Sequence, residues 1–443
     1  MPKKRSHGDG GLYRIRDGKL WRATVTYGRD PETGKPLVWS ATSRTQKGAR
    51  DKMDAAREEI AEYGAPIDKK VTVEQWAPRW LALAQRDIDP KTYSTYASLV
   101  RRHVLPAIGS IKVAALKPSD VAAVRTAIMD KGLATSTARQ SHVVIRLMLD
   151  AARKDRLCRT NVADDAPAPK ARRSTAVAAK RGAFTTAQAI RLLEVAAELP
   201  DGRGARWWFK MLTGARQTEV LGASIADLDL GVAGDEALMG YYAVNWKLEE
   251  LSRRHGCGGM CGRVRAALCP SAQWVIPDDF EMRQVDGRWH LTRPKSKTGR
   301  VTPLIPQLAE MIRAHLALTA DQPNPHGLVW HDGNGRPISP KVDGQEWREL
   351  LVAAGLISAE HAVPGGTTMT GHWARHTAVT VLMEATHGDA QLVGEIVGHS
   401  SAEVTAIYRH VREEERAAAA NAVAKAWGAA LPTRTAAIAG NAG

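Results

Sequence analysis

The 443-residue sequence has few cysteines, no long apolar run and too few acidic residues to balance its basic ones. Four cysteines are too few for a disulfide framework. No stretch of about 18 apolar residues is present, which excludes a transmembrane helix. No apolar stretch follows the basic N-terminal residues, so we expect no signal peptide and a cytoplasmic protein.

The charge balance favours a polyanionic partner. Lys and Arg number 62 against 47 for Asp and Glu, which gives a net charge of +15. Nucleic acid is the first candidate for such a partner, and an anionic membrane surface is the second. A basic surface that is merely solvated is the alternative. The length predicts roughly two to four domains.

Residues 1–65 are predicted to form a small α+β module. Asp17 and Gly18 suit the tight turn of a hairpin, a third strand covers 36–42, and a charged helix covers 45–63. Alternation predicts one apolar and one polar strand face. A polar face of this kind can lie in a DNA groove, and a plain α+β module without that role is the alternative. The predicted DNA-reading residues are Arg14, Arg16, Arg22 and Thr24.

Residues 70–162 are predicted to be all-α. Apolar residues recur at helical spacing over 72–85, 90–103, 118–131 and 135–154, with Pro106 among the residues that punctuate them. The basic residues on these segments, which predict a DNA-binding face, include Arg101, Arg102 and Arg139. A basic linker is predicted at 163–182, and such a segment can lie along phosphates. Its basic residues include Lys170, Arg172 and Arg173.

The region 183–412 is predicted to be a mixed, mainly α domain with a small antiparallel sheet. The predicted strands cover 241–247, 289–292 and 300–306. The predicted helices cover 185–199, 216–225, 307–317, 345–354, 372–385, 390–397 and 402–412. An Ala-rich tail follows at 413–443.

Five short features with chemical potential follow one another in this region. In chain order they are Arg216 three residues before Glu219, lysines 295 and 297 in a predicted turn, His372 three residues before Arg375, Gly398 followed by His399, and Tyr408. Each alone has an ordinary explanation, such as a surface ion pair, a solvated turn or a core tyrosine. Their joint occurrence in this order is improbable by chance.

Taken together, these features resemble the tyrosine recombinases of the phage integrase family. The resemblance covers about residues 183–412. Residues 70–162 resemble the family's helical domain that binds core-type sites, and residues 1–65 resemble its AP2-like domain that binds arm-type sites. The resemblance implies transesterification at a DNA phosphodiester.

The resemblance also assigns roles to individual residues. Tyr408 would be the nucleophile that forms a 3′-phosphotyrosyl bond. Arg216 and Arg375 would hold the non-bridging phosphate oxygens, since planar guanidinium groups suit phosphate. Lys297, preferred here to Lys295, would protonate the leaving 5′-oxygen.

Three further residues would support these groups. His372 would accept or relay the proton of the nucleophile, and His399 would hydrogen-bond the phosphate. Glu219 would brace the site from behind. A structural role is favoured for His376, which follows the catalytic arginine on the helix.

An insertion at about 248–288 carries a second cluster. It contains three thiols and one imidazole, enough for a tetrahedral structural zinc site, among glycines that allow tight turns. The alternative is that the cysteines are small core residues, although this stretch is polar. The predicted ligands are His255, Cys257, Cys261 and Cys269. Cys158 is predicted to be a plain packing or surface thiol.

The implied partners follow from the resemblance. They are double-stranded DNA with core-type and arm-type attachment sites and a homotetramer assembled on DNA, with no membrane. A host DNA-bending protein and an excision directionality factor fit the same scheme. Catalysis would need no cofactor, and zinc would be structural. A transposon recombinase or resolvase with the same chemistry, and a non-catalytic DNA-binding protein, are the alternatives.

Overall fold

The computed structural model describes residues 11–398, except Asp17, Glu32, 169–181, Asp201, 233–239 and 295–298, together with Ala422, Val423 and Lys425. The described residues form two compact units. The first contains the residues up to 168 and the segment Val275–Asp278, and the second contains the rest. Within the described residues, no helix has the length and apolar character needed to cross a membrane.

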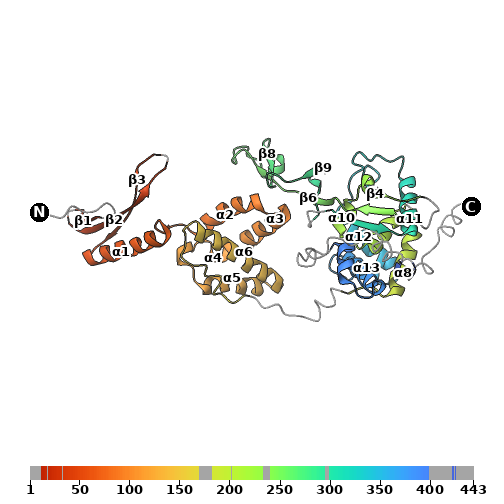
Figure 1. The fold of residues 1–443 in the computed structure, drawn as a ribbon, viewed down its shortest axis with the longest axis horizontal. Coiled ribbons are helices and arrows are strands. Elements are labelled where there is room, and N and C mark those ends of the chain that lie inside the picture. The colour runs from red at the N-terminus through yellow and green to blue at the C-terminus, as the bar shows by residue number, and fades with distance from the viewer. Residues whose placement is uncertain are drawn as a thin grey trace, which may run out of the picture. The chain divides into compact units, whose positions relative to one another are not determined.

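An antiparallel three-stranded sheet with one helix begins the first unit (Figure 1). Its strands, in sheet order, are β1 (Gly11–Ile15), β2 (Leu20–Arg29) and β3 (Pro36–Ser43), and the helix is α1 (Gln46–Tyr63). Ala23 and Val25 of β2 are buried together with Ala49 and Met53 of α1. The α+β arrangement predicted from the sequence is therefore present.

The prediction that Arg14 shares the polar face of this sheet with Arg22 and Thr24 is wrong. Arg14 pairs with Trp21 across the hairpin, and Tyr13 pairs with Arg22. Residues that pair in this way share a face, so Arg14 lies on the Trp21 face, with its guanidinium 5.0 Å from the indole centroid. The turn between the strands sets this register. Arg16 lies in that turn, outside the strand and with a φ of 51°.

A helical bundle completes the first unit. Its helices are α2 (Val73–Asp87), α3 (Pro90–Leu99), α4 (Leu105–Ile108), α5 (Pro118–Asp130) and α6 (Thr135–Lys154). Trp76 is buried in its core and donates a hydrogen bond from Nε1 to the Met148 carbonyl, at 3.0 Å. Arg101, Arg102 and Arg139 are exposed.

Two boundaries in this bundle differ from the prediction. The helix predicted over 90–103 does not end at residue 103, because a π-helical turn, Val100–Val104, leads directly into α4, which ends at Ile108. The N–H of Leu105 bonds to the carbonyl of Val100, so the helix widens just before the proline. The linker also begins later than residue 163, since Ala163 and Ala166 are buried in the bundle core. Lys170, Arg172 and Arg173 lie outside the described residues.

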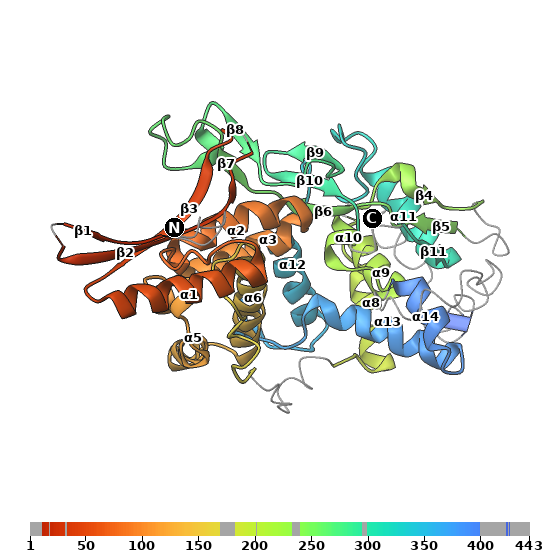
Figure 2. The ribbon, with the colours of Figure 1, turned by 60° about the vertical axis from the view of Figure 1, so that its left-hand side comes forward.

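The second unit is built mainly of helices (Figure 2). They are α8 (Thr186–Ala197), α9 (Gly204–Thr213), α10 (Gln217–Leu221), α11 (Pro306–Leu318), α12 (Pro340–Ala353), α13 (Gly371–Ala385) and α14 (Ala390–Val397). The apolar core of this unit is rich in tryptophan. The core includes Trp207, Trp208, Trp330 and Trp347. The helix predicted at 402–412 lies outside the described residues.

This unit contains three small antiparallel sheets where one was predicted. In the first sheet the strand order is β11 (Val301–Leu304), β5 (Gly240–Ala243) and β4 (Leu228–Asp229). In the second it is β6 (Lys247–Glu250), β10 (Trp289–Thr292) and β9 (Met282–Asp286). The third pairs β7 (Arg253–His255) with β8 (Ala272–Trp274). The single strand predicted at 241–247 is two strands of different sheets. The chain turns between them at Asn245, whose side chain bonds to Asp227.

Charged side chains are buried between α9 and α12. Lys210 of α9 donates a hydrogen bond to Asp343 of α12 at 3.1 Å, and Arg206 forms ion pairs with Asp343 and Glu346. Burial lowers the pKa of Lys210, and the charge of Asp343 opposes that shift. This cluster joins α9, which leads into the site described below, to α12.

Candidate active site

Arg216 and Glu219 are held together by the start of α10. Gly214, with a φ of 60°, ends α9 in the left-handed conformation that suits glycine. Arg216 then occupies the N-cap of α10. The buried Glu219 carboxylate accepts hydrogen bonds from the backbone N–H of Arg216 at 2.9 Å and from its guanidinium at 2.8 Å. The contact predicted from their spacing is therefore present, and it orients the guanidinium.

A second guanidinium joins the first from α13. Arg375 donates hydrogen bonds to the carbonyl oxygen of Gly214 at 2.6 Å and to that of Gly398 at 3.3 Å. Arg216 donates to the same Gly398 carbonyl at 2.6 Å. Gly398 ends α14 with a φ of 70°. The fold thus brings the two predicted phosphate-binding arginines to one shared acceptor, although 159 positions separate them in the sequence.

Arg300 is a third arginine of the site, and no motif in the sequence predicted its role. Its guanidinium donates to Glu219 at 2.7 Å and to the Ile396 carbonyl at 3.3 Å. A Cβ atom on Gly398 would lie 2.8 Å from its Cζ atom, so this glycine leaves room for the guanidinium. Glu219 consequently links two arginines, and we place Arg300 behind the site as a positioning residue.

The charges in this cluster shift its titrations. Burial alone would raise the pKa of Glu219, but Arg300 and Arg216 hold it below its ordinary value. Burial, followed by the charge of Arg216, lowers the pKa of Arg375 to about 10. Desolvation by the surrounding protein is the main cause that lowers the pKa of His372, and the charges of His376 and Arg375 lower it further. The imidazole of His372 is therefore neutral at neutral pH and able to accept a proton.

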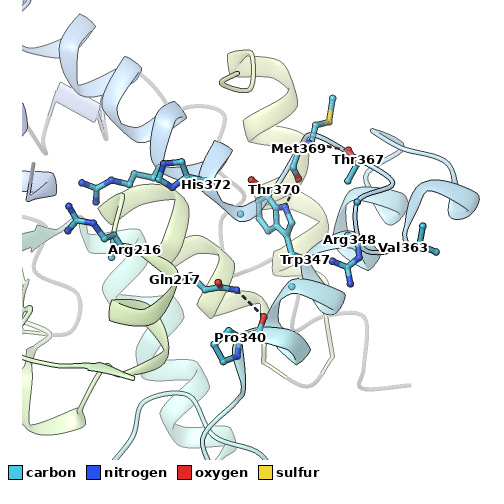
Figure 3. A pocket seen from close by; sticks show the side chains of 15 residues that line it. Arg216, Gln217, Pro340, Trp347, Arg348, Val363, Thr367, Met369, Thr370 and His372 are labelled. Carbon is cyan, nitrogen blue, oxygen red and sulfur yellow. Dashed lines mark hydrogen bonds between the residues drawn. The ribbon is translucent and has the colours of Figure 1, made fainter. Parts of the chain in front are cut away.

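A cavity of about 350 Å³ adjoins these groups. Arg216 and His372 lie on one side of it, with Gln217, Trp347 and Arg348 lining other parts (Figure 3). His372 and His376 of α13 meet edge to face, with ring centroids 4.6 Å apart. Two guanidinium groups and an imidazole around one opening are suited to binding an anionic phosphodiester.

The structure describes only part of the predicted catalytic set. Lys295, Lys297, His399 and Tyr408 lie outside the described residues. The structure therefore brings together the two arginines, Glu219 and His372, and it adds Arg300.

The four predicted metal ligands also lie together. Their ligating atoms are all within 4.8 Å of one another. The Sγ atom of Cys261 lies 3.3 Å from Nδ1 of His255, and the Sγ atoms of Cys257 and Cys269 are 3.5 Å apart. Hydrogen bonds from the backbone N–H and the thiol of Cys261 lower the pKa of Cys257 to about 6. Cys158 lies apart, buried in the bundle of the first unit, where burial raises its pKa to about 11.

Comparisons with known proteins agree with this arrangement. Residues 278–415 match the phage integrase family, and residues 72–129 match the phage integrase N-terminal SAM-like domain. An integrase of Saccharopolyspora erythraea is 26% identical over 94% of this chain and 97% of its own length. An integrase of Streptomyces ambofaciens is 25% identical over 92% of this chain and 94% of its own.

The fold is also found among solved structures. The Tn1549 transposon integrase, solved in complex with transposon right-end DNA, superimposes with a TM-score of 0.54 at 18% identity. The match covers 81% of this chain and all of the solved chain, which is a fragment of the transposon integrase. At this level of identity, the likeness establishes a shared fold with helices and small antiparallel sheets.

Proposed function

Because the chain belongs to the phage integrase family of tyrosine recombinases, we propose that it is a site-specific recombinase that integrates and excises a mobile genome. It would cut and rejoin DNA at attachment sites through a 3′-phosphotyrosyl intermediate. The observation that carries this proposal is the convergence of Arg216 and Arg375 on one acceptor beside His372. Hydrogen bonds to Glu219 and to the Gly214 and Gly398 carbonyls orient the two guanidinium groups.

In the first step, the hydroxyl oxygen of Tyr408 attacks the phosphorus of the scissile phosphodiester. A bond forms between the tyrosyl oxygen and phosphorus, and the bond from phosphorus to the 5′-oxygen breaks. Neutral His372 accepts the tyrosyl proton, and Lys297 donates a proton to the leaving 5′-oxygen. His399 donates a hydrogen bond to the phosphate.

Arg216 and Arg375 stabilise the charge that develops on the two non-bridging oxygens. Glu219 and Arg300 hold Arg216 in place through the contacts described above. In the second step, a 5′-hydroxyl from another strand attacks the phosphotyrosyl bond and releases Tyr408. Each step exchanges one phosphoester for another, so the reaction as proposed uses no metal, nucleotide or redox cofactor.

The DNA partners are assigned to different parts of the chain. The helical bundle of α2–α6 would bind core-type sites through a face that includes Arg101, Arg102 and Arg139, and the sheet β1–β3 would bind arm-type sites. On that sheet, Arg22 and Thr24 share a face and Arg14 lies on the other. Arg14 therefore could not enter the same DNA groove as Arg22 and Thr24. Recombination would take place in a homotetramer on DNA, with a host DNA-bending protein and an excision directionality factor as additional partners.

Covalent trapping tests the proposal. The full chain is incubated, in EDTA, with supercoiled plasmid bearing the DNA that flanks the mobile element, then denatured, and protein-linked DNA is counted. We expect an adduct with the native protein and none with Tyr408→Phe. Tyr241→Phe, which removes a hydroxyl from β5, is the matched control and should keep the adduct. An adduct that persists in Tyr408→Phe would refute the assigned nucleophile. Salt-sensitive DNA binding without any adduct would instead favour a non-catalytic DNA-binding protein.

A further inference from the structure

We propose that His255, Cys257, Cys261 and Cys269 bind one zinc ion, and that this ion folds the tip of the β7–β8 hairpin. The site is structural and separate from the arginine cluster. The proposal rests on the geometry of the four side chains, on the lack of any other core in the tip, and on the chemistry of the donor set.

The spacing of the four donors fits a tetrahedral metal site. A tetrahedron with metal bonds of about 2.0–2.3 Å has edges of about 3.3–3.8 Å. Two of the six donor pairs lie in this range, at 3.3 Å for Cys261 and His255 and 3.5 Å for Cys257 and Cys269, and all six pairs lie within 4.8 Å. A disulfide requires sulfur atoms about 2.05 Å apart. The two sulfurs are therefore spaced as neighbouring ligands rather than as a bonded pair.

The tip of the hairpin has little hydrophobic support. Met260 and Val264 are 88% and 99% exposed, and Leu268 is 61% exposed. Cation–π and ring contacts occur instead at the base of the hairpin. There Trp274 of β8 lies between Arg253, 4.0 Å from its ring centroid, and the ring of His290, 4.4 Å away. Because a loop without a core does not hold four side chains together by burial, a bound ion best explains their convergence.

The backbone is arranged for close approach of the ligands. His255 is the last residue of β7, and Gly256 follows with its N–H bonded to the Ser271 carbonyl at 3.0 Å. A Cβ atom on Gly256 would lie only 2.1 Å from that carbonyl oxygen, so the position requires glycine. Gly258, Gly259 and Gly262 all have positive φ angles, which lets the chain turn sharply on both sides of Cys261.

The donor set selects the metal. Three sulfurs and one imidazole nitrogen suit zinc, whereas calcium and magnesium require oxygen donors. Residues 251–277 contain no Asp or Glu, so no carboxylate of this segment competes for the ion. Three thiolates around Zn²⁺ carry a net charge of −1, and the same segment contains Arg253, Arg254, Arg263 and Arg265 to balance it.

Elemental analysis of the purified full chain tests the proposal. We expect one zinc per chain, released by a mercurial reagent and counted with a chromogenic chelator. Exchange with Co²⁺ should give thiolate-to-metal absorption in the near ultraviolet and the visible bands of a tetrahedral site. Cys261→Ser should lose the metal, whereas Cys158→Ser, which removes the thiol outside the cluster, should retain it.

A second readout reports on the fold of the tip. Trypsin cleavage after Arg263 and Arg265 should accelerate at least tenfold in Cys261→Ser and in the metal-stripped chain, and added zinc should protect the stripped native chain again. A native chain that contains no zinc and does not bind Co²⁺ would overturn the proposal. Loss of two free thiols, with protection that depends on oxidation, would show a disulfide instead. Equal zinc content in the native chain and Cys261→Ser would place the ion elsewhere.

Discussion

Two polar clusters in the second unit are assembled in opposite ways. The arginine cluster takes its members from the start of α10, the residue before β11, α13 and the end of α14, with Arg216 and Gly398 lying 182 positions apart. The Cys/His cluster takes all four members from the 15 residues between His255 and Cys269. The first is preorganised by the surrounding helices and their apolar core. The second has no such core, and a bound ion would have to hold it together.

This difference predicts that a substitution that disrupts one cluster leaves the other intact. Glu219 and Arg375 are almost completely buried, so changes there should affect catalysis or the stability of the whole unit. The hairpin tip is exposed, so changes there should remain local. The three predictions that follow test this separation, from the largest expected effect to the smallest.

Arg375→Lys should reduce covalent adduct formation by about 10²–10³-fold. A lysine keeps the charge but cannot reproduce the two-pronged contact of a guanidinium with phosphate, and a lost donor to a developing anion costs about this much. Single-turnover cleavage of a DNA substrate measures the effect. Arg348→Lys, on the wall of the same cavity, is the control and should change the rate by less than about threefold.

The zinc content of Arg375→Lys should match that of the native chain. A variant that loses both activity and metal would show that the clusters are coupled, and the contrast drawn above would be wrong.

Glu219→Gln should lower the free energy of unfolding by about 3 kcal/mol, because it removes a buried carboxylate from between Arg216 and Arg300. The folded-state pKa of Glu219 is lowered, so its stabilisation is complete above the unfolded pKa of about 4 and disappears as the pH falls through the folded pKa. The difference between native and variant chains should therefore shrink below about pH 4. Denaturant unfolding at several pH values measures it.

Glu250→Gln is the matched control for this change. Glu250 pairs with Arg288 in solvent, at 3.0 Å, and its loss should cost less than about 1 kcal/mol. A loss as large as that of Glu219→Gln would mean that burial of the carboxylate does not explain the difference.

The rate of adduct formation should stay level as the pH falls to about 6.5 and decrease only below it, by up to about tenfold per pH unit. His372 must be neutral to accept the tyrosyl proton, and its lowered pKa keeps it neutral into that range. Single-turnover rates between pH 5 and 8 measure the profile, and His372→Asn should lack this acid limb. A limb above pH 6.5 would contradict the assignment of the base.

Local patterns in the sequence predicted local structure well, including parts of both clusters. Arg216 and Glu219 are one helical step apart, and the Cys/His ligands are separated by short glycine-rich turns, so their contacts depend on nearby residues. Arg300 could not be predicted in the same way, because its partner Glu219 is 81 positions away and only the folded unit brings them together. Lys297, His399 and Tyr408 remain predictions from the family resemblance.

The errors in the predicted fold also have physical causes. Arg14 was assigned to the wrong face because alternation fixes the faces of each strand, while the turn fixes which residues pair. The helix expected over 216–225 ends at Leu221. There Gly222 packs against the backbone of Lys247 and Leu248, where a Cβ atom would lie within 2.6 Å of the Leu248 nitrogen. Neither the pairing of the hairpin strands nor the packing of Gly222 can be predicted from the spacing of apolar residues.

The buried charges between α9 and α12 limit how far the residues of the site can move. The packed core already resists a shift of α9, and the ion pairs of Lys210 and Arg206 with Asp343 add directional contacts between α9 and α12. A shift of one residue along α9 would displace its end by about 1.5 Å. Gly214 ends α9, and its carbonyl accepts a hydrogen bond from Arg375. By holding α9 in place, the charge cluster therefore also fixes the position of the Arg375 guanidinium.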